Sequence, residues 1–246
     1  MWSRVRVLRL AAGMAVGLAL LAAVGAGTWA LLGSSRFPVR EAVLGAPARH
    51  TTQADVERAL RAHLGRNFFA LSPGDARAAL EALPWVRRAS VRRVWPDRLE
   101  VALEEHVALA RWGDAGLVSR LGERFPAAAA DAASLPLFVG PDGTEREMAA
   151  AYARFGAALA PLGARIERIV LTPRHAWQIR LDSGLHIVLG RDAEAAEARL
   201  RRFVQAYPPA LAALARRPER AELQVDLRYA NGFALRVPEL AAGGSG

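Results

Sequence analysis

The side chains that most often carry catalysis are present in this sequence, but they do not stand in catalytic patterns. The five histidines are His50, His63, His106, His175 and His186. They show none of the short spacings that place two imidazoles on one metal ion, so we interpret each as a surface or turn residue. No serine lies in a G-x-S-x-G or S-x-x-K motif, and Ser183 stands in an Asp-Ser-Gly triplet typical of a turn. The sequence therefore predicts neither a metal centre nor a serine hydrolase.

Cofactor sites are not predicted either. The G-x-x-x-x-G-K-[ST] loop that cradles phosphates is missing, and the G-x-G at Gly25 and Gly27 lies inside a long apolar segment. Carboxylates such as Glu104 and Glu105 could serve a glycosidase, but any chain with 24 acidic residues offers such pairs. The lack of cysteine excludes disulfides, thiolate metal sites and cysteine nucleophiles. We expect no cofactor, no metal ion and no catalytic residue.

Residues 10–32 form an apolar segment without a charged side chain, preceded by Arg4, Arg6 and Arg9. A helix of this length spans roughly 35 Å, more than the hydrocarbon core of about 30 Å. By the positive-inside rule, the arginines predict that residues 1–9 stay in the cytoplasm and that the remainder is exported. A cleavable signal peptide is the alternative, but its apolar region is usually only about 7 to 15 residues long. We therefore favour one membrane anchor that holds an extracytoplasmic region.

Composition and charge describe the rest of the chain as globular. The 246 residues are 52% hydrophobic and 23% charged, which is enough for two domains with packed cores. No second apolar run is long enough to span a membrane, which excludes a polytopic transporter or channel. The net charge of +9 comes from arginine without lysine, a pattern typical of GC-rich coding. Acidic residues are interleaved with the arginines and no nucleic-acid-binding motif accompanies them, so we expect no nucleic-acid partner.

The residues after the anchor predict a compact α+β module. Thr52 and Asp55 have the spacing of a capping box at the start of a helix, and Ser72 can cap the next one. Two strands joined by a tight turn are then predicted, and apolar and charged residues alternate clearly over the second. Two helices can cover one face of the resulting three-stranded sheet. The predicted elements are a strand at 37–45, a helix ending near Gly65, a helix stopped by Pro84, and strands at 86–94 and 98–105.

The remaining residues predict a mostly antiparallel sheet with two helices. Thr144 and Glu147 again have capping-box spacing, and Met148 and Phe155 belong to one apolar stripe that suits core packing. Strand signals alternate on both sides of Asn231-Gly232 near the end of the chain. The predicted elements are a hairpin within 110–125, a helix from 144, strands at 168–172, 176–181 and 185–189, a helix at 193–207, and strands at 223–229 and 233–237.

One long run carries a specific resemblance: residues 84–112 read PWVRRASVRRVWPDRLEVALEEHVALARW. This run resembles the POTRA domain of the FtsQ/DivIB family of bitopic cell-division proteins. Asn67-Phe68-Phe69, residues 171–191 and residues 225–232 extend the resemblance over most of 37–238. It implies an α+β fold with a single N-terminal transmembrane helix, a POTRA domain of order β-α-α-β-β, and a mixed or antiparallel β domain with two helices. The implied boundaries are a cytoplasmic tail at 1–9, the transmembrane helix at 10–32, the POTRA domain at 37–106, the C-terminal β domain at 107–238 and a flexible tail at 239–246.

The resemblance also implies that the protein acts by binding and not by catalysis. Proteins of this family are single-pass scaffolds of the inner membrane at the division septum, with a cytoplasmic N-terminus and a periplasmic C-terminus. Their terminal β-strand accepts a strand from FtsB, which acts with FtsL; FtsK, FtsW, FtsI and FtsN are further expected partners. The residues that match the partner-binding region are Arg174, Arg228, Tyr229, Asn231, Gly232 and Phe233. The residues that match the recruitment region of the POTRA domain are Arg88, Val91 and Arg93.

Two other functional classes remain as alternatives: a POTRA-containing factor for envelope assembly or transport, and a cell-wall hydrolase. The first would need lipid-facing strands of about 9 to 11 residues, whereas the second region predicts two soluble helices and lacks aromatic girdles. From alternation alone, Tyr229 is as well explained by a core position, in line with Val225 and Leu227. A terminal strand at a sheet edge, however, leaves backbone groups free for a partner strand, and Tyr229 would then serve as its anchor.

Overall fold

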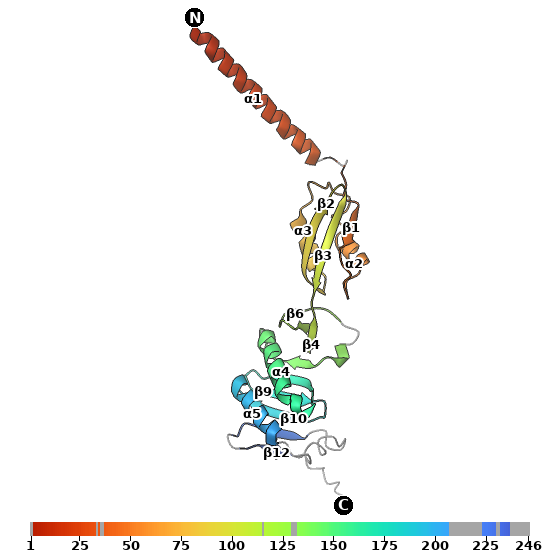
Figure 1. The fold of residues 1–246 in the computed structure, drawn as a ribbon, viewed down its shortest axis with the longest axis vertical. Coiled ribbons are helices and arrows are strands. Elements are labelled where there is room, and N and C mark those ends of the chain that lie inside the picture. The colour runs from red at the N-terminus through yellow and green to blue at the C-terminus, as the bar shows by residue number, and fades with distance from the viewer. Residues whose placement is uncertain are drawn as a thin grey trace, which may run out of the picture. The chain divides into compact units, whose positions relative to one another are not determined.

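The computed structural model describes residues 2–32, 34, 37–114, 116–128, 132–206, 223–229 and 232–236. The chain divides into two compact units, Met1–Glu105 and His106–Gly246. Figure 1 shows an N-terminal helix, a small α+β region, and a β-rich region with helices. This is the fold class that the sequence predicts. Asn231 and the expected tail at 239–246 lie outside the described residues.

Helix α1 (Trp2–Leu32) is continuous over the predicted anchor. Its 19 residues Ala12–Ala30 are apolar and long enough to cross a membrane, and none of them is buried inside the structure. The hydroxyl of Thr28 lies 2.9 Å from the carbonyl oxygens of Val24 and Gly25, so this polar group is satisfied within the helix. These features are those of a single-pass membrane protein.

The first unit contains a three-stranded sheet of order β1-β3-β2. Strand β1 runs parallel to β3, whereas β2 and β3 form an antiparallel hairpin. Helix α2 packs against β1 and α3 against β2, and the core includes the fully buried Leu60, Leu80 and Leu99. The elements are β1 (Glu41–Leu44), α2 (Gln53–Ala59), α3 (Pro73–Glu81), β2 (Val86–Val94) and β3 (Arg98–Glu105).

Local sequence signals set the starts of both helices. The side chain of Thr52 accepts a hydrogen bond from the Asp55 N–H at 3.2 Å, and the Asp55 carboxylate accepts one from the Thr52 N–H at 3.0 Å. The predicted capping box is therefore confirmed. At the start of α3, the Ser72 side chain accepts a hydrogen bond from the Asp75 N–H at 3.3 Å.

Helix α2 ends earlier than predicted, and β1 begins later. The early end of α2 is explained by the pairing of Val39 with the chain that follows the helix. The Val39 N–H donates to the Arg66 carbonyl at 2.9 Å, and the Val39 carbonyl accepts from the Gly65 N–H at 2.8 Å. This pairing places Gly65 and Arg66 alongside Val39, whereas β1 begins at Glu41 because its partner Arg98 is the first residue of β3.

The carboxylate of Glu105, at the end of β3, holds the loop that precedes α2. It accepts backbone hydrogen bonds from Arg49 at 2.8 Å, His50 at 3.1 Å and Thr51 at 2.7 Å. Burial raises the pKa of Glu105, but the hydrogen bonds from Thr51 and its neighbours lower it further than burial raises it. The pKa of Glu105 therefore lies below its usual value, and the ionised form stabilises the fold.

We expect Glu105→Ala to lower the free energy of unfolding by about 1 to 3 kcal/mol, with solvent access favouring the lower half of this range. Since the folded pKa is depressed, the stabilisation is present above the unfolded pKa and is lost as pH falls through the folded pKa. Urea unfolding should therefore show a larger difference between wild type and variant at about pH 7 than at about pH 3. Glu104→Ala, which removes only the surface ion pair with Arg87, is the matched control. Equal effects of the two substitutions would contradict the role of Glu105.

The second unit contains a nine-stranded sheet of order β12-β11-β10-β9-β8-β7-β4-β5-β6. Strands β8, β9 and β10 form the predicted antiparallel meander. Strands β10 and β11, which precede and follow helix α5 in the chain, pair in parallel. Helices α4 and α5 pack against each other and against the sheet (Figure 1). The elements are β4 (Ala108–Trp112), β5 (Leu117–Ser119), β6 (Arg124–Phe125), β7 (Leu137–Val139), α4 (Glu145–Leu159), β8 (Ile166–Leu171), β9 (Trp177–Leu181), β10 (His186–Gly190), α5 (Ala193–Ala206), β11 (Gln224–Asp226) and β12 (Ala234–Arg236), with short 3-10 helices at Ala132–Ser134 and Ala160–Leu162.

Alternation along the strands gives this sheet two different faces. One face packs against α4 and α5 and carries large apolar side chains in cross-strand register. This buried row consists of Ile169, Ile179, Ile187 and Val225, each at most 1% exposed. The residues between them point to the opposite face of the sheet.

Two features of the second unit differ from the sequence prediction. The capping box at Thr144 is wrong, because its hydroxyl donates to the Pro141 carbonyl at 2.6 Å and makes no hydrogen bond to the helix. Strand β7 has no counterpart among the predicted strands. It pairs in parallel with β4 and β8, so its partners lie far away in sequence and leave no local signal.

Candidate protein-binding site

Strand β12 forms one end of the nine-stranded sheet. It pairs antiparallel with β11, and Ala234, Leu235 and Arg236 are all exposed. No strand pairs with its outer side within the residues that the structure describes. An edge strand of this kind presents backbone groups with which another chain can pair.

The hydrogen bonds of β11 show which backbone groups of β12 point outward. The carbonyl of Leu223 and the N–H of Leu227 each form a 2.9 Å hydrogen bond with β10. Since successive residues of a strand bond to opposite sides, the first and last residues of β11 bond toward β12. Ala234 and Arg236, the first and last residues of β12, are in register with these two residues, so their backbone groups point toward β11. Leu235, between them, directs its N–H and C=O away from the sheet.

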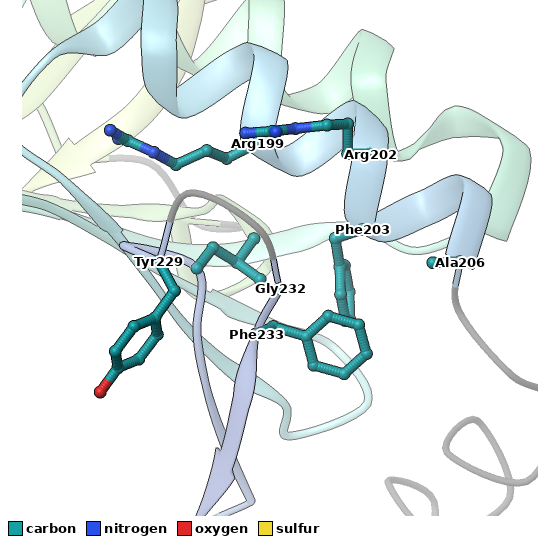
Figure 2. A pocket seen from close by; sticks show the side chains of 8 residues that line it. Arg199, Arg202, Phe203, Ala206, Tyr229, Gly232 and Phe233 are labelled. Atoms are coloured by element: carbon teal, nitrogen blue, oxygen red, sulfur yellow. The ribbon is translucent and has the colours of Figure 1, made fainter.

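A pocket of about 460 Å³ lies between α5 and the chain of β11 and β12 (Figure 2). Phe203 of α5 and Phe233 meet edge to face, with ring centroids 5.3 Å apart and planes at 89°. Arg199 and Arg202 extend from the same helix above this aromatic pair (Figure 2). The pocket can therefore accept an apolar side chain beside guanidinium groups. It is lined by Arg199, Arg202, Phe203, Ala206, Leu227, Tyr229, Gly232 and Phe233.

Tyr229 borders this pocket but does not belong to the core. Its side chain is 57% exposed, whereas Leu227 is 3% exposed. Strand β11 ends at Asp226, so the alternation that buries Val225 and Leu227 does not reach Tyr229. Figure 2 shows the ring projecting away from the Phe203–Phe233 pair with the hydroxyl outermost. The alternative of a core position for Tyr229 therefore does not apply, and an exposed aromatic side chain stands beside the edge.

Arg228 is held by Asp226 where the chain leaves β11. Its Nη2 and Nε donate to the carboxylate at 2.6 and 2.9 Å, and its backbone N–H donates at 3.0 Å. The side-chain hydrogen bonds lower the pKa of Asp226 and raise the pKa of Arg228. Gly190, at φ 91°, has the left-handed conformation that favours glycine, and a Cβ there would lie only 3.2 Å from Nη1 of Arg199. Arg228 therefore positions the chain before Tyr229 and is not a free cation.

Arg174 lies in the turn between β8 and β9 and is exposed. Trp177, just after this turn, is in register with Gly190 at the end of β10. The chain that leaves β11 toward Tyr229 runs past this same end of the sheet, because the Leu227 N–H bonds to β10. With neighbouring strands about 4.8 Å apart, Arg174 and Tyr229 are separated by roughly 10 to 15 Å along this end. Arg174 can therefore contact a partner that docks on Tyr229, but it does not adjoin β12.

Of the remaining predicted binding residues, two line the pocket and one is not described. Gly232 is exposed and Phe233 is half-buried, and both line the pocket. Asn231 lies outside the described residues. The pocket residues of α5 are absent from the predicted set, although Arg199, Arg202, Phe203 and Ala206 recur at helical spacing and thus share one face of the helix. That signal is in the sequence, but only the packing of the hairpin beside it identifies the face as part of a site.

The predicted recruitment residues lie on β2 of the first unit. Val91 and Arg93 point to the face covered by the helices, and Nη1 of Arg93 donates to the Phe68 carbonyl at 3.1 Å. Arg88 stands opposite Glu104 on the other face. These residues therefore share one strand at the edge of the sheet but not one surface.

No group of three histidine, aspartate or glutamate side chains that could hold a metal ion occurs in the part of the chain that the structure describes. The geometry that stands out is instead a free strand edge, an aromatic pocket beside it and an exposed tyrosine. This combination suits the binding of another polypeptide.

Known proteins resemble the chain over almost its whole length. Residues 37–106 match the POTRA domain, FtsQ-type, and residues 110–228 match the C-terminal domain of cell division protein FtsQ/DivIB. Cell division protein FtsQ of Burkholderia pseudomallei is 40% identical over 240 residues, which cover 96% of this chain and 94% of that protein. Cell division protein FtsQ of Nitrosospira multiformis is 44% identical over 188 residues, 76% of each chain. The chain therefore belongs to the FtsQ/DivIB family of cell division proteins.

Proposed function

We propose that this protein is a non-enzymatic divisome scaffold that captures FtsB, together with FtsL, by addition of a β-strand to β12. Capture at this edge would link early and late division proteins at the septum. The observation that carries the proposal is the outward-facing backbone of Leu235 on an edge strand with a pocket beside it. The family to which the chain belongs supports a role in cell division.

Two kinds of contact would act together at this edge. Backbone hydrogen bonds to β12 provide affinity that depends little on the partner's sequence, and side chains that enter the pocket provide specificity. The Phe203–Phe233 pair forms the aromatic wall of that pocket, and Tyr229 extends the apolar surface outward. Arg174 adds a positive charge for an acidic partner residue at the same end of the sheet.

The membrane anchor supports a periplasmic location for this binding. Arg4, Arg6 and Arg9 precede the apolar part of α1, so the positive-inside rule supports a cytoplasmic N-terminus in the inner membrane. Both units would then be periplasmic, and the strand that pairs with β12 must come from the periplasmic part of FtsB.

We assign recruitment to the first unit, as a POTRA domain at 37–106, and capture of FtsB to the β domain at 107–238. Within the described residues, β2 is also an edge strand, and Arg88, Val91 and Arg93 lie along it. FtsK, FtsW, FtsI and FtsN are the candidate partners for surfaces other than β12. The two assignments are separable, because each surface lies within its own compact unit.

The test uses the full chain in lipid nanodiscs and the purified periplasmic parts of FtsB and FtsL. We expect saturable binding with a Kd in the micromolar range or tighter, equivalent to about −8 kcal/mol or better. A periplasmic coiled-coil domain of an unrelated protein serves as the control and should not bind. Absence of saturable binding would overturn the proposal, and sustained release of muropeptides from peptidoglycan would favour a hydrolase instead.

A further inference from the structure

The sheet face opposite α4 and α5 carries a row of basic side chains. Arg168 of β8 is in register with Arg180 of β9, and Arg180 is in register with His186 of β10. The row continues through Gln224 of β11 to Arg236 of β12. Five neighbouring strands therefore place three arginines and one histidine in a single line that ends at the free edge.

This cationic row lies on the solvent side of the sheet. Arg168, Arg180 and Arg236 are exposed, and His186 and Gln224 are partly exposed. In β8, β9, β10 and β11 the row alternates with side chains of the buried face beneath the helices, namely Ile169, Ile179, Ile187 and Val225. The charges are thus accessible from outside and separated from the core by the thickness of one sheet.

The row concentrates positive charge that the described residues do not balance. Directly opposite residues in neighbouring strands have Cβ atoms about 4.5 to 5.5 Å apart, and like charges in such positions destabilise a sheet. Among the described residues, the row has one ion pair, Arg180 with Glu167 at 3.6 Å on the surface. Asp226 lies on the same face but is taken by Arg228. Burial lowers the pKa of His186, and the nearby charges of Arg180 and Arg168 lower it further.

A hollow of about 400 Å³ opens along the row. It is lined by Arg168, Val170, Gln178, Ile179, Arg180, Gly184 and His186. Guanidinium, imidazole and amide groups are hydrogen-bond donors that suit carboxylates. The hollow is therefore a place where an anionic group can replace the missing countercharge.

We propose that the cationic row binds an acidic, extended segment of the polypeptide that docks on β12. The inference rests on the proposed function, because Arg236 belongs to β12 and the row starts where the partner strand would lie. From β12 to β8 the row crosses about 19 Å, a distance that about six extended residues cover. A partner chain that pairs with β12 and then turns around the edge reaches every member of the row.

The shape of the charge distribution favours a polypeptide over a membrane surface or a wall polymer. The adjoining row on the same face carries no cation among the described residues: it consists of Val170, Gln178, Val188, Asp226 and Ala234. A flat anionic surface would be matched by cations spread over the whole face, whereas a line one residue wide matches the carboxylates of a single extended chain.

The test compares two charge-neutralising double variants of the full chain in nanodiscs of zwitterionic lipid. The first is Arg168→Gln with Arg180→Gln, and the matched control is Arg120→Gln with Arg146→Gln, two exposed arginines elsewhere in the second unit. The two probes are hexaglutamate and the periplasmic part of FtsB, and binding to anionic vesicles and to soluble peptidoglycan strands is measured in parallel. The row variant should lose hexaglutamate binding at least about 10-fold and FtsB affinity about 5- to 20-fold, mainly through slower association at low salt. The control should change neither by more than about 2-fold.

Each outcome decides between the two proposals. The row variant should melt at or above the wild-type temperature, because it removes like-charge repulsion. If FtsB does not bind the wild type but hexaglutamate still requires the row, the assignment of FtsB fails and the acidic-segment site stands. If row variant and wild type bind both probes equally, the inference is overturned. It is also overturned if the row variant loses binding only to anionic vesicles or to soluble peptidoglycan strands.

Discussion

Tyr229→Ala is expected to weaken the capture of FtsB about 30-fold while the second unit stays folded. The side chain is 57% exposed and lies beyond the buried row of the sheet, so its loss removes little core packing. An aromatic anchor at an interface is typically worth about 2 kcal/mol or more on truncation. A change of about 2 kcal/mol corresponds to a factor of about 30 in Kd. Titration of FtsB against the full chain in nanodiscs measures this change.

Two matched variants identify which property of Tyr229 matters. Tyr229→Phe keeps the ring and should remain within about 3-fold of wild type if apolar contact carries the energy. Arg174→Ala removes an exposed charge at the same end of the sheet and should cost at most about 5-fold, because exposed ion pairs contribute about 0 to 1 kcal/mol. A wild-type Kd for Tyr229→Ala would remove this residue from the binding site.

The elements that the sequence predicts most accurately are those with strong local patterns. Strands β2 and β3 have the predicted bounds, because apolar and charged residues alternate over β3 and a Trp-Pro-Asp turn separates the two strands. The capping box at Thr52 is confirmed for the same reason, since all its hydrogen bonds lie within four residues. Local patterns are sufficient where the stabilising contacts are themselves local.

The errors arise where distant contacts decide. Helix α2 ends early because Val39 pairs with the chain after it, and β7 forms only because β4 and β8 flank it. In each case the partner lies outside the pattern that was used for prediction.

The candidate site, too, can be predicted from the sequence only where local patterns describe it. A terminal strand with Tyr229 near it follows from alternation and from the resemblance to the family. The pocket does not follow from either of them, because it forms only where the face of α5 that carries Phe203 packs beside Phe233. The cationic row is likewise hidden in sequence, because Arg168 and Arg236 are far apart in the chain and meet in one line only through strand register.

Leu235→Pro is expected to weaken FtsB binding by at least about 100-fold, the largest effect of any single change considered. Proline removes the outward N–H of β12, and leaving a partner carbonyl unpaired costs about 1 to 3 kcal/mol. Its ring also occupies the space in which the incoming strand would lie. The fold should tolerate the change, because the Leu235 N–H does not bond to β11 and edge strands accept proline at such positions.

The control for this variant is Leu235→Ala, which keeps the N–H and trims a side chain that is already 39% exposed. It should stay within about 3-fold of wild type in Kd. Circular dichroism and thermal unfolding of the proline variant establish that the second unit remains intact. If a folded Leu235→Pro binds FtsB as well as wild type does, backbone pairing is not the mode of capture, even if Tyr229→Ala weakens binding. The pair of variants therefore separates strand addition from side-chain docking on the pocket, because only strand addition requires the outward N–H of β12.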